Sequence, residues 1–332
     1  MSGRKRILTG DRPTGRLHLG HYAGSLQSRV ELQKEYETFI IIADVQAMTT
    51  NFEKPEKIKQ DVLNVALDNL AVGIDPEQAT FFIQSMIPQI AELTVFYSML
   101  VSVNVLRHNP TIKTEASQYG YKDLTYGFLG YPVSQAADIT FCKAHLVPSG
   151  DDQLPHIEVA RRLVRRFNAL YKPVLVEPEA LLSKCPRLAG IDGNAKMGKS
   201  LNNAIYLSDS EGEVSAKIKS AVTDANRITA RDKGNPDICV VYKYHAVFNN
   251  NECPDITDLC RNAGIGCVAC KKKLELSVNG LLGPIRERRK YYEERTGKVR
   301  EILQAGSDKV RKIAEATVDE VKEAMSIKYF KN

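Results

Sequence analysis

Lys5-Arg-Ile-Leu-Thr-Gly-Asp-Arg-Pro-Thr-Gly-Arg-Leu-His-Leu-Gly-His21 opens with a short strand candidate, Lys5–Thr9, and continues into a connection with three glycines and two histidines. A helix-like pattern follows this connection. The first backbone N–H groups of a helix are free and its dipole is positive there, which suits a phosphate group. His18 and His21 add two imidazole donors, and Gly20 leaves room for a flat base to approach the backbone. The stretch therefore predicts a nucleotide-binding connection.

Residues 1–85 alternate between strand-like and helix-like patterns. Phe39–Ala43 is a continuous apolar run, as expected of a strand that is covered on both faces. Such alternation predicts an α/β fold with a Rossmann-type, doubly wound parallel sheet, whose ligands bind at the carboxyl ends of the strands. The expected strands are Lys5–Thr9, Glu37–Ala43, Ala79–Gln84 and Ala144–Pro148, and the expected helices are His21–Tyr36, Pro55–Val72 and Gln153–Phe167.

The remaining chain divides by pattern into three parts. Residues 86–130 look mostly helical, residues 180–200 look like a loop, and the pattern beyond Ile205 is helical almost throughout. We therefore predict a catalytic domain over residues 1–205 and an all-helical domain over residues 206–332.

The 332-residue chain has an ordinary globular composition, with 43% hydrophobic and 26% charged residues. No run reaches the ~18 apolar residues of a membrane span, and no apolar signal-peptide core follows the basic start, so we expect a cytoplasmic protein without a membrane partner. Residues 271–332 hold 16 of the 46 Lys and Arg and 10 of the 40 Asp and Glu, so residues 1–270 are neutral overall. A basic helical tail suits a nucleic-acid partner, although it is also common on a solvated helix face.

A second motif, Lys196-Met-Gly-Lys-Ser200, lies in a glycine-containing loop. Two ammonium groups there suit a departing pyrophosphate, and attack on an α-phosphate needs positioning and charge neutralisation more than covalent chemistry. Taken alone, each motif is more often chance than function. Their order is harder to obtain by chance, because the first follows the first strand and the second closes the predicted catalytic domain.

With both motifs present, the chain resembles the class I aminoacyl-tRNA synthetases, whose H-x-G-H and K-M-S-K-S signatures match His18–His21 and Lys196–Ser200. Ile42–Thr49, Tyr131–Ile139 and Leu146–Gln153 narrow the resemblance to the bacterial tryptophanyl-tRNA synthetases, and it covers nearly the whole chain. The resemblance implies activation of L-tryptophan by ATP with Mg²⁺ and transfer of tryptophan to tRNA(Trp). It further implies a homodimer.

The resemblance also assigns roles to single residues. Asp138 would accept a hydrogen bond from the indole N–H of tryptophan, which is the one donor of that ring; without the family, Asp138 would be interpreted as a helix cap or an ion-pair partner. The other implied tryptophan contacts are Leu8, Tyr131, Gln135, Ile139, Val147 and Gln153. The implied ATP contacts are Gly10, Arg12, Thr14, Gly20, His21, Gly150, Asp151, Asp152, Leu188, Lys196, Met197, Gly198, Lys199 and Ser200, and the implied catalytic residues are His18, His21, Lys196 and Lys199. Gly198 departs from the family pattern, which has serine there.

Five of the seven cysteines fall in the segment that runs from Cys239 to Cys270, which in a reducing cytosol favours a metal site over disulfides. Four thiolates with one C-x2-C pair suit zinc or an iron–sulfur cluster, and the spacing does not choose between them. Some bacterial tryptophanyl-tRNA synthetases carry a 4Fe-4S cluster, and the resemblance of Cys239–His245 and of the C-x6-C-x2-C tail to theirs implies that cluster, with zinc as the alternative. The implied ligands are Cys239, Cys260, Cys267 and Cys270, while Cys253 is left over and Cys142 and Cys185 are interpreted as structural.

Three other functions stay open at the level of sequence. Tyrosyl-tRNA synthetases share the scaffold. Small-molecule nucleotidylyltransferases use the same histidine motif, although they do not need the lysine loop or a basic helical tail. A regulatory or electron-transfer protein would use the cysteine site on a synthetase scaffold. Under the synthetase hypothesis, residues 206–332 bind the anticodon part of tRNA and residues 86–130 form the dimer interface.

Overall fold

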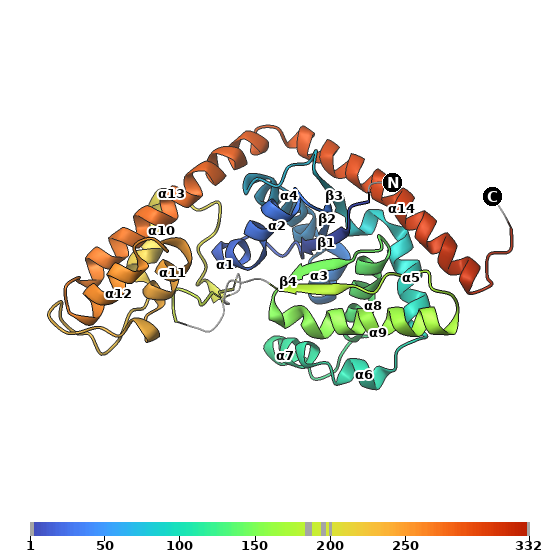
Figure 1. The fold of residues 1–332 in the computed structure, drawn as a ribbon, viewed down its shortest axis with the longest axis horizontal. Coiled ribbons are helices and arrows are strands. Elements are labelled where there is room, and N and C mark those ends of the chain that lie inside the picture. Colours follow the sequence, from blue (N-terminus) through green and yellow to red (C-terminus); the bar gives the residue numbers. More distant parts are fainter. Residues whose placement is uncertain (1–2, 183–187, 194–196, 199–200, 331–332) are drawn as a thin grey trace.

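A five-stranded parallel sheet forms the centre of the computed structural model, which describes residues 3–182, 188–193, 197–198 and 201–330 (Figure 1). Its strand order is β3-β2-β1-β4-β5, which confirms the predicted doubly wound α/β class. The order changes direction between β1 and β4, so the ligand crevice of such a sheet lies at the carboxyl ends of these two strands. The strands are β1 (Arg6–Asp11), β2 (Glu37–Ile42), β3 (Ala79–Ile83), β4 (Leu146–Ser149) and β5 (Glu179–Leu182).

Both faces of the sheet are buried, as the apolar run in β2 predicts. Ile40 and Ile42 belong to one core, together with residues of α4 (Pro55–Ala71). Phe39 and Ile41 belong to the opposite core, together with residues of α8 (Tyr126–Thr140) and α9 (Leu154–Leu170). Because successive side chains of a strand point to opposite faces, a strand between two cores must be apolar at every position.

Two expectations for the first 205 residues need correction. The helix expected over His21–Tyr36 begins and ends earlier, as a continuous run of α1 (Leu19–His21), the π-helical turn η1 (Tyr22–Leu26) and α2 (Gln27–Leu32). The loop expected over residues 180–200 overlaps β5, which pairs with β4. The sequence of β5 has no β-branched or aromatic residue, so it carries no local strand signal. Between these elements lie α3 (Asp44–Asn51), η2 (Gln84–Met86), α5 (Pro88–Ser98), α6 (Val103–Arg107), α7 (Pro110–Tyr119) and η3 (Asp151–Gln153).

The described chain beyond Ile205 is built from helices, as predicted. Figure 1 shows α13 lying over the group α10–α12 and α14 returning along the sheet-containing body. Residues of α14 pack in the same core as β2 and α5, so the C-terminal helical segment does not stand apart from the sheet. No helix in the described ranges is both long enough and apolar enough to cross a membrane. The helices are α10 (Glu211–Ser220), η5 (Pro236–Ile238), α11 (Val240–Phe248), α12 (Cys253–Arg261), α13 (Cys267–Glu293) and α14 (Thr296–Ala324).

Gly306 allows the close approach of α14 to β3. A Cβ atom at this position would lie 1.9 Å from the carbonyl oxygen of Phe81, so Gly306→Ala must push the helix away from the strand. We expect this substitution to lower the free energy of unfolding by about 1–3 kcal/mol, as overpacking does. Gly297→Ala, on the same helix with open space around the added methyl group, should not destabilise the protein. Urea unfolding of both variants tests this, and an equal loss in both would contradict it.

Candidate active site

The two histidines of the H-x-G-H motif cap the helix that they begin. His18 Nδ1 accepts the backbone N–H of Gly20 at 3.1 Å, and His21 Nδ1 accepts the backbone N–H of His18 at 3.2 Å. The centroids of the two rings lie 3.8 Å apart. Because each Nδ1 atom is used as an acceptor, the donor of each neutral ring is its Nε2–H. The capping pattern therefore fixes which edge of each imidazole can donate a hydrogen bond.

The H-x-G-H segment lies against the residues around the second motif. Met197 is buried, and its sulfur lies 3.6 Å from the position of a Cβ atom on Gly20. The backbone N–H of Leu19 donates to Ile205 O at 2.9 Å, and that of Leu207 donates to Leu17 O at 3.0 Å. The structure thus brings together two motifs that lie far apart in the sequence. Three residues predicted in the second motif, Lys196, Lys199 and Ser200, lie outside the described residues.

Gly10 and Gly198, both predicted to contact ATP, have clear local surroundings. A Cβ atom on Gly10 would lie 1.9 Å from Ile41 O, so close packing of β1 on β2 requires glycine there. The N–H of Gly198 donates to Asn203 Oδ1 at 2.9 Å, and a Cβ atom on Gly198 would make only ordinary contact with Leu201. The serine that the family has at this position would therefore fit.

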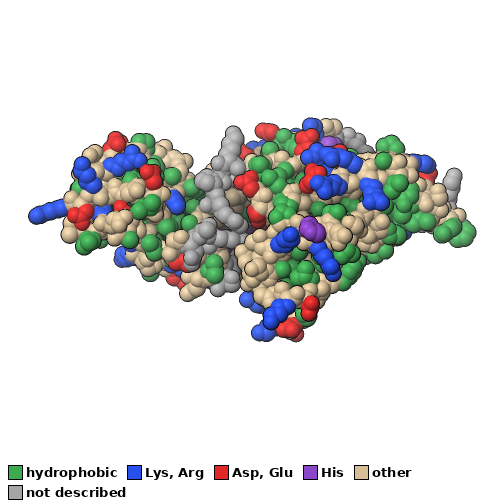
Figure 2. All heavy atoms as spheres, turned by 90° about the horizontal axis from the view of Figure 1, so that it is seen from below, with side chains coloured by type: hydrophobic (Ala, Val, Ile, Leu, Met, Phe, Trp, Pro, Cys, Tyr) green, Lys and Arg blue, Asp and Glu red, His purple; other side chains and the backbone are tan. Residues whose placement is uncertain are grey.

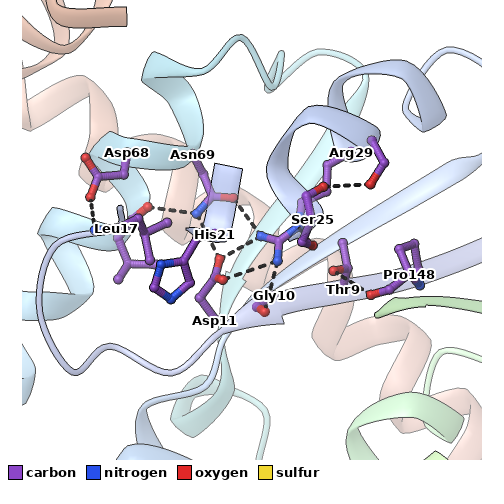
Figure 3. Close-up of polar contacts among 12 residues, drawn as sticks. Thr9, Gly10, Asp11, Leu17, His21, Ser25, Arg29, Asp68, Asn69 and Pro148 are labelled. Atoms are coloured by element: carbon purple, nitrogen blue, oxygen red, sulfur yellow. Dashed lines mark hydrogen bonds and ion pairs between the residues drawn. The ribbon is translucent and has the colours of Figure 1, made fainter. Parts of the chain in front are cut away.

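A buried ion pair anchors the end of β1 beneath the motif (Figure 3). Arg29 donates to both carboxylate oxygens of Asp11, at 2.6 and 3.2 Å, and also to Gly10 O at 3.1 Å. Burial alone would raise the pKa of Asp11, but the charge and hydrogen bonds of Arg29 outweigh it and lower this pKa to about 2. Asn69 completes the group by donating to Asp11 at 3.2 Å. The pair holds the strand end in a fixed position.

A second buried carboxylate connects the motif to the C-terminal helices. Asp68 on α4 is fully buried, and its Oδ2 accepts the backbone N–H of Leu17 at 2.7 Å (Figure 3). Its Oδ1 is paired with Arg289 of α13. Arg289 itself is only 5% exposed. A chain of contacts thus joins α13 to the residue that precedes His18.

Asp138, the predicted indole acceptor, is buried and held by two amide side chains. Gln84 Nε2 donates to both of its carboxylate oxygens, at 2.8 and 3.0 Å, and Gln46 Nε2 donates to Oδ2 at 3.2 Å. Gln46 and Gln84 follow the carboxyl ends of β2 and β3, so this carboxyl group lies at the ligand-binding edge of the sheet. Burial raises the pKa of Asp138 to about 7, against the two amide hydrogen bonds, which lower it.

The other predicted tryptophan contacts fall into a polar and an apolar set. Tyr131 Oη lies 2.8 Å from His156 Nε2, and Gln135 Nε2 donates to Gln153 Oε1 at 3.2 Å. Burial lowers the pKa of His156 to about 4, so its ring is neutral at physiological pH. The apolar set is buried in the core that contains β2 and α8, and its members are Leu8, Ile139 and Val147.

The predicted ATP contacts Arg12 and Thr14 follow β1. Arg12 Nη2 donates to Glu115 Oε1 of α7 at 2.9 Å, and the N–H of Thr14 donates to Arg12 O at 2.9 Å. Most of the other predicted ATP contacts lie in or beside η3, which directly follows β4, and one lies against the second motif. They are Gly150, Asp151 and Asp152 around η3, and Leu188, whose carbonyl accepts the N–H of Met197 at 3.2 Å.

All four predicted cysteine ligands line one cavity, together with Arg227 and mainly apolar side chains, whereas Cys253 does not line it. Cys270 Sγ lies 3.4 Å from His245 Nε2, and Arg227 Nη1 lies 3.8 Å from Cys260 Sγ. Within the described ranges, no three His, Cys, Asp or Glu side chains are close enough together to hold one metal ion. Cys142 is buried in the core, as expected of a structural cysteine, and Cys185 lies outside the described residues.

The basic tail is expected to suit a nucleic-acid partner, but Arg289 cannot contribute its charge to such a surface, because it is buried against Asp68. Arg286 and Arg288 also bond to backbone oxygens of this chain, donating to Asp209 O at 2.8 Å and to Ala71 O at 2.6 Å, although Arg288 stays exposed. On the face shown in Figure 2, Lys and Arg side chains occur on both parts of the molecule and do not gather into one patch. Part of the positive charge of the tail therefore serves packing.

Sequence reasoning missed the polar residues that support the site. Asp68 and Asn69 interrupt an apolar stretch of α4, Val65–Ala71, and are themselves buried. Buried polar groups in such a stretch need partners, which is the signal that could have marked them. Their partners Leu17, Arg29 and Arg289 are distant in the sequence, so no local pattern identifies the pairs.

A parallel nucleotide-binding sheet with the two motif segments in contact is the architecture of a class I aminoacyl-tRNA synthetase. Residues 2–283 match the family model described as tRNA synthetases class I (W and Y), and the chain belongs to this family. Within the family, it groups with the bacterial tryptophanyl-tRNA synthetases. The tryptophan–tRNA ligases of Streptococcus agalactiae serotype V and Streptococcus pyogenes serotype M1 are 48% identical over 336 residues and 50% identical over 337 residues, each match covering 98% of both chains.

Solved structures give the same result. The tryptophanyl-tRNA synthetase of Campylobacter jejuni, complexed with ADP and tryptophan, matches with a TM-score of 0.85 and 30% identity over 97% of this chain and 99% of that chain. The tyrosyl-tRNA synthetase of Archaeoglobus fulgidus, complexed with L-tyrosine, has a TM-score of 0.70 at 20% identity over 86% of this chain and 90% of that chain. The second match is a likeness of fold alone.

Proposed function

We propose that this protein activates L-tryptophan with ATP and transfers the tryptophanyl group to the 3′ end of tRNA(Trp). The carboxylate of tryptophan attacks the α-phosphate of ATP, the bond to the β-phosphate breaks, and pyrophosphate leaves. Because the nucleophile belongs to the substrate, the protein has to bind, orient and neutralise charge. Mg²⁺ that accompanies ATP supplies further positive charge to the phosphates.

In this proposal, the Nε2–H groups of His18 and His21 donate to the ATP phosphates. Lys196 and Lys199 neutralise the departing pyrophosphate. The tryptophan amino group lies near Tyr131 and Gln153, and the remaining residues predicted above line the nucleotide and indole subsites.

The observation that carries the proposal is the buried carboxyl group of Asp138. A carboxylate offers about four acceptor positions, and the amides of Gln46 and Gln84 make three hydrogen bonds to it. One acceptor position is thus available for an indole N–H. A site built around that donor rejects side chains without one, because its buried acceptor would lose a partner.

Amino-acid-dependent pyrophosphate exchange tests the proposal. We expect exchange with L-tryptophan in the presence of ATP and Mg²⁺ and none with the other amino acids. Exchange that depends on tyrosine and not on tryptophan would contradict the proposed substrate and assign the chain the specificity of a tyrosyl-tRNA synthetase. Absence of exchange with any amino acid would contradict the proposed reaction itself.

We further propose that the chain is a cytoplasmic homodimer whose catalytic part is residues 1–205 and whose helical part, residues 206–332, binds the anticodon region of tRNA(Trp). Large apolar side chains stand exposed in or near the 86–130 segment, and such surfaces mark protein interfaces. Light scattering gives the mass in solution that tests the dimer. The exposed side chains are Val95, Met99, Val103, Val105, Tyr119 and Tyr126.

We also propose that Cys239, Cys260, Cys267 and Cys270 hold a 4Fe-4S cluster, with zinc as the alternative. The donor set fits, because four thiols line one cavity and thiolates are the usual ligands of such clusters. The guanidinium of Arg227 in the same cavity suits a cluster with net negative charge. A bound cluster would cross-link three elements, because Cys239 directly precedes α11, Cys260 lies in α12, and Cys267 and Cys270 lie in the first turn of α13.

Cys267→Ser is expected to lose most of the iron, while Cys253→Ser, whose side chain does not line the cavity, should keep it. Protein purified without oxygen is analysed for iron, acid-labile sulfide and visible absorbance. A colourless wild-type protein with stoichiometric zinc would contradict the cluster and favour the alternative. Equal loss of iron in both variants would contradict the ligand assignment.

A further inference from the structure

We propose that Glu115 accepts the α-ammonium group of the amino-acid substrate. The inference rests on the proposed activation of tryptophan, and it adds a residue that the sequence motifs do not mark. Glu115 lies on α7, in the segment between β3 and β4, and reaches the end of β1, where Oε1 accepts Arg12 Nη2 at 2.9 Å. The carboxylate therefore enters the crevice from the helices that cover it.

The second carboxylate oxygen of Glu115 is the main evidence. Oε2 is buried and makes no hydrogen bond of normal geometry within the described part of the chain, although the Tyr131 hydroxyl interacts with the same carboxylate, and the Glu115 side chain is only 16% exposed. A buried charged acceptor without a partner is costly, so such atoms in a crevice indicate a missing donor. An ammonium group supplies up to three N–H donors and a compensating charge.

The neighbours of Glu115 indicate an amino-acid subsite. Its charge acts on Tyr131, His156 and Arg12, which places all four side chains in one part of the crevice. Tyr131 is a predicted tryptophan contact. Because burial lowers the pKa of His156 to about 4, the neutral imidazole does not compete with a substrate cation for the carboxylate.

The Arg12–Glu115 pair is also complementary to a zwitterion. An amino acid placed with its ammonium group at Glu115 has its carboxylate on the side of Arg12, at the end of β1. That carboxylate is the proposed nucleophile, so the same pair that binds the ammonium group would orient the attacking oxygen. The alternative is that the ion pair only holds α7 against β1. In that case, loss of the pair would weaken the binding of ligands with and without an ammonium group equally.

Ligand analogues separate these two roles. Tryptamine keeps the ammonium group and lacks the carboxylate, and indole-3-propionate keeps the carboxylate and lacks the ammonium group. The chain has no tryptophan of its own, so the indole fluorescence of each ligand reports binding directly. Dissociation constants are measured for L-tryptophan and both analogues on the full-length protein and its variants.

Glu115→Gln is expected to weaken tryptophan and tryptamine binding by about 10- to 100-fold, the range for a hydrogen bond to a charged group. Indole-3-propionate binding should stay within about twofold. Arg12→Gln breaks the same ion pair from the other side but keeps the carboxylate, so its tryptamine affinity should be retained. Glu115→Asp, which keeps the charge, should lose less than Glu115→Gln.

Equal weakening of all three ligands by Glu115→Gln, or loss of tryptamine binding in Arg12→Gln, would overturn the inference in favour of a structural pair. Unchanged tryptamine affinity in Glu115→Gln, alongside tryptophan-dependent pyrophosphate exchange by the wild type, would overturn the inference and leave the proposed function standing. A wild-type protein without such exchange would overturn both.

Discussion

Asp138→Ala is expected to lower kcat/KM for tryptophan by at least about a thousandfold, while KM for ATP changes little. The substitution removes the acceptor for the indole N–H and also leaves the amides of Gln46 and Gln84 buried without their shared partner. A site built to hydrogen-bond one substrate group typically favours that substrate by ~10⁴–10⁵ in kcat/KM over an analogue that lacks the group, so loss of the hydrogen bond is costly. Pyrophosphate exchange at saturating ATP, measured against tryptophan concentration, gives kcat/KM for tryptophan. Exchange at saturating tryptophan, measured against ATP concentration, gives KM for ATP. Comparable weakening toward both substrates would indicate general disruption of the site.

The ionisation of Asp138 gives this prediction a pH signature. Its pKa is raised to about 7, so the stronger, charged acceptor forms as the pH rises through this value, and tryptophan affinity should rise with it. The effect of pH on the stability of the fold runs in the opposite direction to its effect on tryptophan affinity. The unfolded carboxyl group loses its proton near pH 4 and the folded one only near 7, so its contribution to stability falls as the pH rises between these values.

Asp138→Asn is the matched control, because it keeps the shape and removes the titration. Its tryptophan affinity should be low and should lack the rise through about pH 7. An unchanged pH profile in this variant would show that another group is responsible.

Arg289→Met is expected to lower the free energy of unfolding by about 3–5 kcal/mol, the usual cost of breaking a buried ion pair from one side. Asp68 would remain fully buried and would lose the guanidinium that neutralises its charge. Because Leu17 precedes His18, we also expect KM for ATP to rise more than KM for tryptophan. Urea unfolding and pyrophosphate exchange measure the two effects.

Two further variants test the origin of this effect. Glu293→Gln removes the other carboxylate partner of Arg289, which is half-exposed, and should cost only about 0–1 kcal/mol. The double substitution Asp68→Asn with Arg289→Met leaves no buried charge at the pair and should recover much of the lost stability. If the losses in the free energy of unfolding caused by Asp68→Asn and Arg289→Met simply add up in the double variant, the two side chains are not coupled.

The sequence indicated those parts of the site that lie in short continuous stretches. The apolar run of β2, the strand-to-helix connection around His18 and the four cysteines are each visible within one short segment, and the family signatures fix their order. Strand β5 and the end of α2 at Leu32 were missed or misplaced. These boundaries depend on pairing with β4 and on packing against the sheet, which override weak local preferences.

By itself, then, the sequence determined the fold class, the order of the two motifs and the set of thiols, because local periodicity and motif spacing are properties of the chain. Only the tertiary structure decided that Met197 meets Gly20, that Arg289 serves Asp68 instead of facing solvent, and that Glu115 has a buried oxygen in the crevice. The physical reason is that the charge of a side chain and its burial are independent in a sequence. Arg289 belongs to a run of basic residues typical of a solvated helix, and only the packing of α13 on α4 gives it a buried carboxylate as partner.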